Sequence, residues 1–121
     1  MALRSLDELT FDNQFVRNLP ADPEPANFRR QVRNACYSRV LPTPVCAPKL
    51  IAWSREVGEL LEFDESVFAS NEFAQVFAGN KGVNGMDPFA MCYGGHQFGN
   101  WAGQLGDGRA INLGEVLNQR G

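Results

Sequence analysis

A glycine-rich stretch towards the end of the sequence constrains the fold more than any other feature. The string YGGHQFGNWAGQLGDGRAINLGE, residues 93–115, holds seven of the chain's 12 glycines together with its only histidine. Glycine lacks a Cβ, so it permits positive φ and lets a ligand approach the amide nitrogens. Because packing alone rarely requires so many glycines, we interpret this segment as a loop that handles a nucleotide.

The pair Asp107-Gly108 in this stretch is a strong signal for a tight turn between antiparallel strands. We therefore predict a short strand over residues 100–104 and a second strand over residues 110–118. The whole segment 93–118 is then a glycine-rich loop and β-hairpin.

The glycine spacing around this turn suits phosphate binding but does not prove it. Gly106 and Gly108 leave amide groups open, and Arg109 places a permanent cation beside them. Such amides and a guanidinium can surround phosphate oxygens with charge-assisted hydrogen bonds. The string is neither a dinucleotide fingerprint nor a P-loop, because the following helix and the Lys-Ser/Thr ending are missing. An ordinary turn with a solvated arginine remains the alternative.

Two proline-rich segments predict extended connectors. Residues 19–26 (LPADPEPA) and 41–48 (LPTPVCAP) contain prolines that fix φ and remove backbone donors. The apolar run KLIAW, residues 49–53, is short enough for a buried strand.

Residues 54–79 form the predicted helical region. Ser54 is placed to cap a helix from Arg55 to about Phe63, with apolar side chains recurring on one face. Asp64 is placed to cap a second helix, which Ser70 could instead divide in two. The apolar stripe of this region predicts core, and Gly79 supplies the stop. The fold class is therefore α+β.

Charge and cysteine content narrow the class of protein. A net charge of −3 gives no general attraction to nucleic acid or to an anionic membrane. No apolar run has the length of a membrane span, and the first residues lack the apolar core of a secretory signal. The chain has an odd number of cysteines, and their spacing is not that of a metal site: Cys36, Cys46 and Cys92. We therefore expect reduced, mostly buried thiols. We also expect a cytoplasmic protein.

Three strings together resemble a known family. ACYSRVLPTPVCAP, FAQVFAGN and CYGGHQFGNWAGQLGDGRAINLGEV closely resemble the N-terminal part of the selenoprotein O family, the pseudokinase-like protein adenylyltransferases. The likeness extends from about Phe11 through the last residue. It implies an incomplete protein-kinase-like N-terminal lobe with short helices, extended proline-rich segments and a glycine-rich β-hairpin.

The resemblance also implies a reaction and a set of ligands. Members of this family bind ATP in a reversed orientation and transfer AMP to Ser, Thr or Tyr hydroxyl groups of proteins, with Mg²⁺ or Mn²⁺. By the family pattern, Gly106, Gly108 and Arg109 match the first nucleotide-binding positions. The phosphate-binding lysine, the catalytic-base aspartate and the metal ligands belong to later parts of the family's chain. We therefore expect no catalytic residue, no metal ligand and no adenylylation activity within these 121 residues.

The other residues of the glycine-rich segment suggest structural roles. We expect Phe98 and Trp101 to anchor the loop to the core, and the ring nitrogens of His96 to satisfy nearby backbone groups. Two alternatives to the enzyme interpretation remain open. One is a binding module that holds a nucleotide or a protein without chemistry, and the other is a structural domain with an ordinary hairpin.

Overall fold

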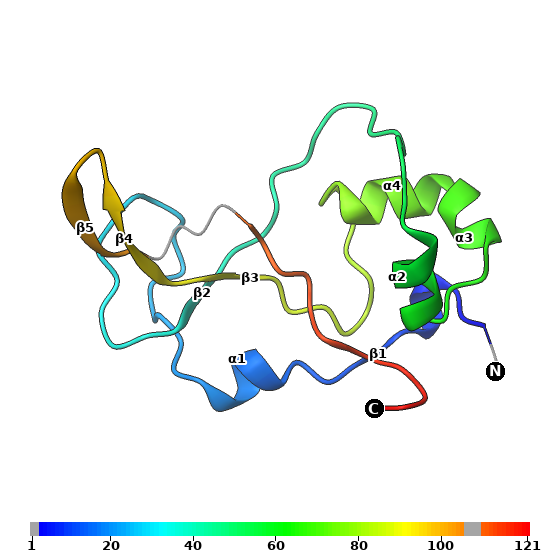
Figure 1. The fold of residues 1–121 in the computed structure, drawn as a ribbon, viewed down its shortest axis with the longest axis horizontal. Coiled ribbons are helices and arrows are strands. Elements are labelled where there is room, and N and C mark those ends of the chain that lie inside the picture. Colours follow the sequence, from blue (N-terminus) through cyan, green and yellow to red (C-terminus); the bar gives the residue numbers. More distant parts are fainter. Residues whose placement is uncertain (1–2, 106–109) are drawn as a thin grey trace. The chain divides into compact units, whose positions relative to one another are not determined.

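The computed structural model contains short helices and paired strands, which confirms the α+β class (Figure 1). It describes residues 3–105 and 110–121. In chain order, the elements are the 3₁₀-helix η1 (Leu6–Glu8), β1 (Thr10–Phe11), α1 (Gln14–Asn18), β2 (Tyr37–Arg39), α2 (Arg55–Leu60), α3 (Ser66–Ala69), α4 (Asn71–Phe77), β3 (Phe89–Met91), β4 (Tyr93–Gln97), β5 (Asn100–Leu105) and β6 (Val116–Leu117).

The chain divides into two compact units, each assembled from separated segments. Unit 1 consists of Met1–Asp12, Pro42–Met86 and Glu115–Gly121, and unit 2 of Asn13–Leu41 and Asp87–Gly114. The three two-stranded sheets are antiparallel, with β1 paired to β6, β2 to β3 and β4 to β5.

Serine caps begin the longer helices of unit 1, as their sequence predicts. The Ser54 side chain accepts a hydrogen bond from the Val57 amide at 3.3 Å, and α2 begins at the next residue. The predicted second helix is divided at Ser70, whose hydroxyl accepts from the Phe73 amide at 3.2 Å and donates to the Val67 carbonyl at 2.6 Å. Ser70 therefore ends α3 and caps α4 at once.

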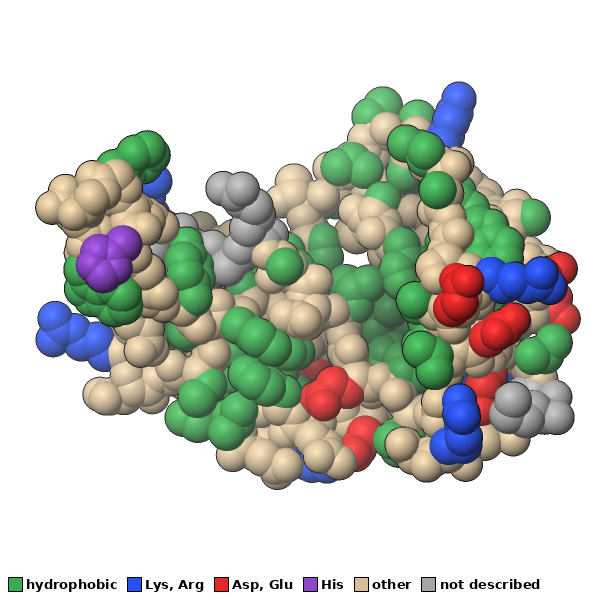
Figure 2. Space-filling view, viewed as in Figure 1, with side chains coloured by type: hydrophobic (Ala, Val, Ile, Leu, Met, Phe, Trp, Pro, Cys, Tyr) green, Lys and Arg blue, Asp and Glu red, His purple; other side chains and the backbone are tan. Residues whose placement is uncertain are grey.

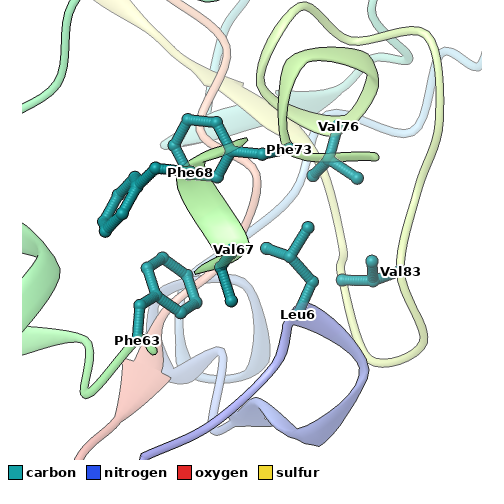
Figure 3. Packing of buried hydrophobic residues seen from close by; sticks show 7 residues of the cluster. All are labelled: Leu6, Phe63, Val67, Phe68, Phe73, Val76 and Val83. Carbon is teal, nitrogen blue, oxygen red and sulfur yellow. The ribbon is translucent and has the colours of Figure 1, made fainter. Parts of the chain in front are cut away.

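The core of unit 1 contains most of the apolar stripe that the helical spacing predicts (Figure 3), but Phe77, the last residue of that stripe, is 48% exposed. Rings from the helices meet those of neighbouring segments edge to face: Phe63 lies 5.8 Å from Phe68, and Phe68 lies 5.0 Å from Phe73. Such edge-to-face pairs add to the stabilisation from apolar burial. The buried members of the cluster are Leu6, Phe63, Val67, Phe68, Phe73, Val76 and Val83.

Two expectations for unit 1 are wrong. Residues 49–53 form no strand, and Ile51 is 98% exposed, because no neighbouring strand pairs with this run. On α2 the apolar side chains of Val57 and Leu60 lie outside the core, and the residue of this helix that is buried is Gly58.

The ends of unit 1 are joined through Arg4 and Glu62. The Arg4 guanidinium lies 3.4 Å from the Glu62 carboxylate and donates to the carbonyls of Leu61 and Leu117. The other Glu62 oxygen accepts from the Gln119 amide at 2.8 Å. These bonds connect the start of the chain, the segment after α2 and the residues that follow β6.

A second, smaller core lies in unit 2. The ring of Phe89 stacks on Phe15 at 5.0 Å and meets Tyr37 edge-on at 5.6 Å. Tyr37 is 1% exposed, and its hydroxyl donates a 2.6 Å hydrogen bond to the Val16 carbonyl. The β2–β3 pair therefore packs on α1 through aromatic side chains.

The proline-rich connectors are extended, as predicted. Residues 19–26 carry a single bridge, from Ala21 to Tyr37, and no helix. Residues 41–48 lie beside Asn80, whose side-chain amide both accepts from the Val45 amide and donates to the Val45 carbonyl, each at 2.7 Å. The loop predicted around residues 79–88 is also present, and Gly79 has φ +86° after α4.

The predicted hairpin is wrong in its second half. β5 pairs with β4, whereas residues 110–118 contribute a bridge from Asn112 to Phe89 and the strand β6, which pairs with β1. The other edge of β5 is already occupied, because the Val32 amide donates to the Gln104 carbonyl at 3.0 Å. Among the described residues, no helix has the length and hydropathy that crossing a bilayer requires.

Candidate functional site

The β4–β5 ribbon leads directly into the predicted phosphate loop. Its strands are joined by Phe98 and Gly99, which have φ of +51° and +83°. Two successive residues with positive φ are typical of the turn that matches the twist of a two-residue hairpin. Because Gly99 tolerates this conformation without strain, the chain reverses here and β5 then runs towards residue 106.

The three predicted site residues lie outside the described residues. Gly106, Gly108 and Arg109 all fall between residues 105 and 110, as does the predicted Asp107-Gly108 turn. The structure describes the two sides of this segment, which are the strand β5 and the exposed Ala110. Phosphate binding by Gly106, Gly108 and Arg109 therefore stays a prediction.

Two glutamine side chains fasten β5 to the segment before β2. Gln104 donates through its side-chain amide to the Ala35 carbonyl at 2.8 Å, and Gln31 donates to the Ala102 carbonyl at 2.9 Å. With the backbone bond from Val32, these contacts fix the strand that enters the loop. The sequence patterns predicted neither glutamine. Gln104 lies within the string GQLGDGR, but the sequence around a glutamine in a strand does not indicate which distant backbone group its side chain will bind.

The glycine at position 94 makes room for an aromatic ring. An added Cβ there would lie 2.7 Å from Cη2 of Trp101, so the indole covers this part of the strand. His96 meets the same indole edge-on, with ring centroids 5.4 Å apart. Trp101 is nevertheless 61% exposed and Phe98 is fully exposed, so the expectation that both rings anchor the loop to the core is wrong. The tight turn carries Phe98 outward, beyond reach of the unit 2 cluster.

Unit 2 contains a half-buried ion pair. Arg30 pairs with Asp22, which also accepts from the Ser38 hydroxyl at 2.9 Å and from the Glu24 amide at 3.2 Å. Burial by itself would raise the pKa of Asp22, but these hydrogen bonds outweigh it and hold that pKa below the ordinary 3.8. Asp22 is therefore a charged structural carboxylate.

The second ion pair of unit 2 joins the strands β2 and β3 at their other end. Arg39 donates to both oxygens of Asp87, at 3.1 and 3.2 Å. This hydrogen bonding raises the pKa of Arg39 above its ordinary value, so the guanidinium is always charged. With more than half of the Arg39 side chain exposed, the pair contributes little to stability.

The three cysteines are free thiols in the structure, and the expectation that they are mostly buried is wrong, because none of them is fully buried. Cys36 and Cys92 are half-buried neighbours across the end of the β2–β3 pair, where the Cys92 amide donates to the Cys36 carbonyl at 2.9 Å. Burial, followed by the nearby Asp22 carboxylate, raises the pKa of Cys92 and keeps it a thiol. Cys46 is exposed on the second proline-rich connector.

Within residues 3–105 and 110–121, no three His, Cys, Asp or Glu side chains come together as a possible metal site.

Comparison with known proteins connects these features to named relatives. The family model described as "Protein adenylyltransferase SelO" matches residues 24–121. Proteins named "Protein nucleotidyltransferase YdiU" are similar over nearly the whole chain. They include those of Azoarcus sp. (strain BH72), 68% identical over 113 residues, and Rhodopirellula baltica, 67% identical over 110 residues.

The relatives are much longer than this chain. The match covers 93% of the chain but 22% of the Azoarcus protein, and 91% of the chain but 20% of the Rhodopirellula protein. The chain therefore spans about a fifth of the length of these curated relatives. Since the family model matches most of the sequence, including the glycine-rich string, the chain belongs to the SelO family of protein adenylyltransferases.

Proposed function

We propose that this chain is the nucleotide-loop part of an enzyme that transfers AMP from ATP to Ser, Thr or Tyr hydroxyl groups of proteins. The family match over residues 24–121 carries this proposal, because it includes both the β4–β5 ribbon and the loop that follows it. The names of the relatives, protein nucleotidyltransferases, support the same class of reaction. By the same resemblance, we assign the chain to a kinase-like N-terminal lobe.

AMP transfer requires stabilisation of the negative charge that develops on the leaving pyrophosphate. The acceptor hydroxyl oxygen forms a bond to the α-phosphorus while the bond from that phosphorus to the β-phosphate oxygen breaks. The hydroxyl proton passes to a base, and pyrophosphate leaves with the bonding electrons. Open amides at Gly106 and Gly108 and the Arg109 guanidinium would stabilise this negative charge, because it grows in the transition state.

Residues of the described ribbon would position that loop. Gln31, Val32 and Gln104 hold β5 through three hydrogen bonds to the segment before β2. A phosphate-binding loop works best when its supporting strand is rigid, since misplacement by an ångström weakens catalysis. These residues are positioning residues rather than catalytic ones.

The rest of the reaction would need groups beyond the matched fifth of the enzyme. We propose that the proton acceptor and the Mg²⁺ or Mn²⁺ ligands belong to that larger part, so the 121-residue chain by itself does not transfer AMP. We also propose a cytoplasmic location, which the three free thiols support.

A chimera tests the assignment of Arg109. In the Azoarcus protein, the matched 113 residues are replaced by those of this chain, a change supported by their 68% identity. Transfer of AMP from α-labelled ATP to a protein acceptor is then measured. Replacing Arg109 with Ala should lower kcat/KM by about 10² to 10³, the usual effect of removing one preorganised charge stabiliser.

The control for this experiment is Arg33→Ala, which removes an exposed arginine of unit 2 and should leave transfer unchanged. Normal transfer by Arg109→Ala would remove Arg109 from the site. A chimera that binds ATP but labels no acceptor would favour the alternative function, a nucleotide-binding module without chemistry.

A further inference from the structure

Unit 1 contains an apolar groove beside α2. Its volume is about 270 Å³, and we call it the α2 groove. Apolar side chains from α2, α3, α4 and the segment before α2 make almost all of its lining, which consists of Leu50, Ala52, Trp53, Ser54, Val57, Gly58, Leu61, Phe63, Phe68, Phe73 and Phe77.

Aromatic rings continue from the core of unit 1 out into this groove. Trp53 stacks on the buried Phe68 with ring centroids 3.8 Å apart and planes 7° from parallel, yet Trp53 remains 41% exposed. Phe77 extends the series from Phe73 at 4.4 Å and is 48% exposed. A connected apolar surface of this kind is typical of an interaction site.

Helix α2 explains why this surface has no cover within unit 1. Its apolar residues have helical spacing, which predicts a buried face, but Val57 and Leu60 are each more than half exposed. The helix packs on Phe68 through Gly58 instead, where an added Cβ would lie 2.5 Å from the ring. The apolar face of α2 is thus available to a further segment of polypeptide.

The charge of unit 1 indicates the chemistry of that segment. Unit 1 carries ten acidic and five basic side chains, and Arg55 at the start of α2 is already paired with Glu59 and Glu65. On the face drawn in Figure 2, Asp and Glu side chains lie next to hydrophobic ones over the region of α2 and α3, together with Lys or Arg. An apolar segment flanked by Lys or Arg complements the net negative charge of unit 1.

We propose that the α2 groove is an intramolecular docking site for an amphipathic segment of the longer adenylyltransferase. In the named relatives, most of the polypeptide lies outside the match, which covers 20–22% of their length. That segment would place apolar side chains against Trp53 and Phe77 and basic residues beside acidic side chains of unit 1. Such docking requires the longer polypeptide of the family's members and does not depend on AMP transfer.

Hydroxyl-radical footprinting tests whether the groove is covered in the longer protein. Oxidation of Trp53 and Phe77 is compared between the 121-residue chain and the Azoarcus chimera described above. Both side chains should react about tenfold more slowly in the chimera, because a docked segment excludes water and radicals from the rings. Equal rates in the two proteins would overturn the proposal.

A matched pair of variants separates docking from general folding effects. Val57 lines the groove and Val45 lies outside its lining, and each is 51% exposed. In the chimera, Val57→Lys should restore the oxidation of Trp53 to the rate seen in the 121-residue chain, whereas Val45→Lys should leave it protected. Protection that survives Val57→Lys would contradict an occupant that reaches α2.

Sedimentation of the 121-residue chain decides between this occupant and a second copy. We expect a monomer with an open groove. A dimer that Val57→Lys dissociates would assign the groove to self-association and overturn the proposal. None of these measurements uses ATP or an acceptor protein. The docking proposal can therefore be overturned while AMP transfer is confirmed, and docking can be confirmed while AMP transfer is not found.

Discussion

At the scale of single residues, unit 2 depends on polar groups that the sequence did not mark. Position 22 lies in a connector that was predicted only to be extended, yet its carboxylate receives three hydrogen bonds. Tyr37 is similar, because its aromatic ring predicts burial while its hydroxyl partner, the Val16 carbonyl, is 21 residues away. Propensity and spacing do not encode such partners, since these partners are brought together only by the tertiary fold.

Acid should weaken unit 2 through Asp22. Its pKa is lower in the folded chain than the ordinary 3.8, so its contribution to stability is complete above that pH and is lost as the pH falls through the folded value. The free energy of unfolding, measured in urea, should therefore decrease between pH 6 and pH 2.5. The Asp22→Asn variant should have a lower free energy of unfolding at pH 6, and that free energy should fall less steeply as the pH is lowered. Asp7→Asn, on an exposed carboxylate, is the control, and equal slopes for all three proteins would contradict this role.

Removal of one hydroxyl should also be costly. Tyr37→Phe keeps the ring but leaves the buried Val16 carbonyl without its donor, which costs about 1–2 kcal/mol. Urea unfolding followed by tyrosine and tryptophan fluorescence measures the loss. Tyr93→Phe, which removes a hydroxyl from a 40% exposed residue, should change stability by less than about 0.5 kcal/mol. A similar loss in both variants would exclude a special role for Tyr37.

At the scale of elements, helices were predicted better than strands. Ser54 and Ser70 are caps that act through their own neighbours, so a local pattern is sufficient to find them. β6 was missed because its pairing with β1 joins distant segments, and a turn signal at residues 107–108 cannot report which edge of β5 is already bonded. β4, the partner of β5, is adjacent in the chain, but its two glycines give no strand signal, because glycine is depleted in strands. The candidate site has a similar limit, because the sequence predicts its loop but not the glutamines that hold β5.

The glycine inside α2 provides a test in which two effects oppose each other. Alanine is favoured over glycine in a helix by about 1 kcal/mol. At position 58, however, a Cβ would lie 2.5 Å from the buried Phe68 ring, and such overpacking costs about 1–3 kcal/mol. We expect Gly58→Ala to lower the urea midpoint and to weaken the stacking of Trp53 on Phe68. The control is Gly82→Ala, where nothing lies within 4 Å; a stabilised Gly58→Ala would show that the ring moves freely.

At the scale of the molecule, the described residues form two separate hydrophobic cores. One is centred on the phenylalanines of α3 and α4, and the other on Phe89 with Tyr37. The sequence contains the apolar residues of both clusters. Their division into units could not be predicted, because each unit gathers segments from widely separated parts of the chain.

The connection from Arg4 to the carbonyl of Leu117 spans 113 residues and closes unit 1 together with the β1–β6 pair. During synthesis on a ribosome, this bond would therefore form only after almost all of these residues have emerged, although Leu61 and Glu62, the other partners of Arg4, emerge much earlier. Until then β1 would lack its strand partner, and a chaperone that holds unpaired strand edges would have its longest opportunity during that interval. Moving β6 next to β1 by circular permutation would shorten the wait without altering a single side chain.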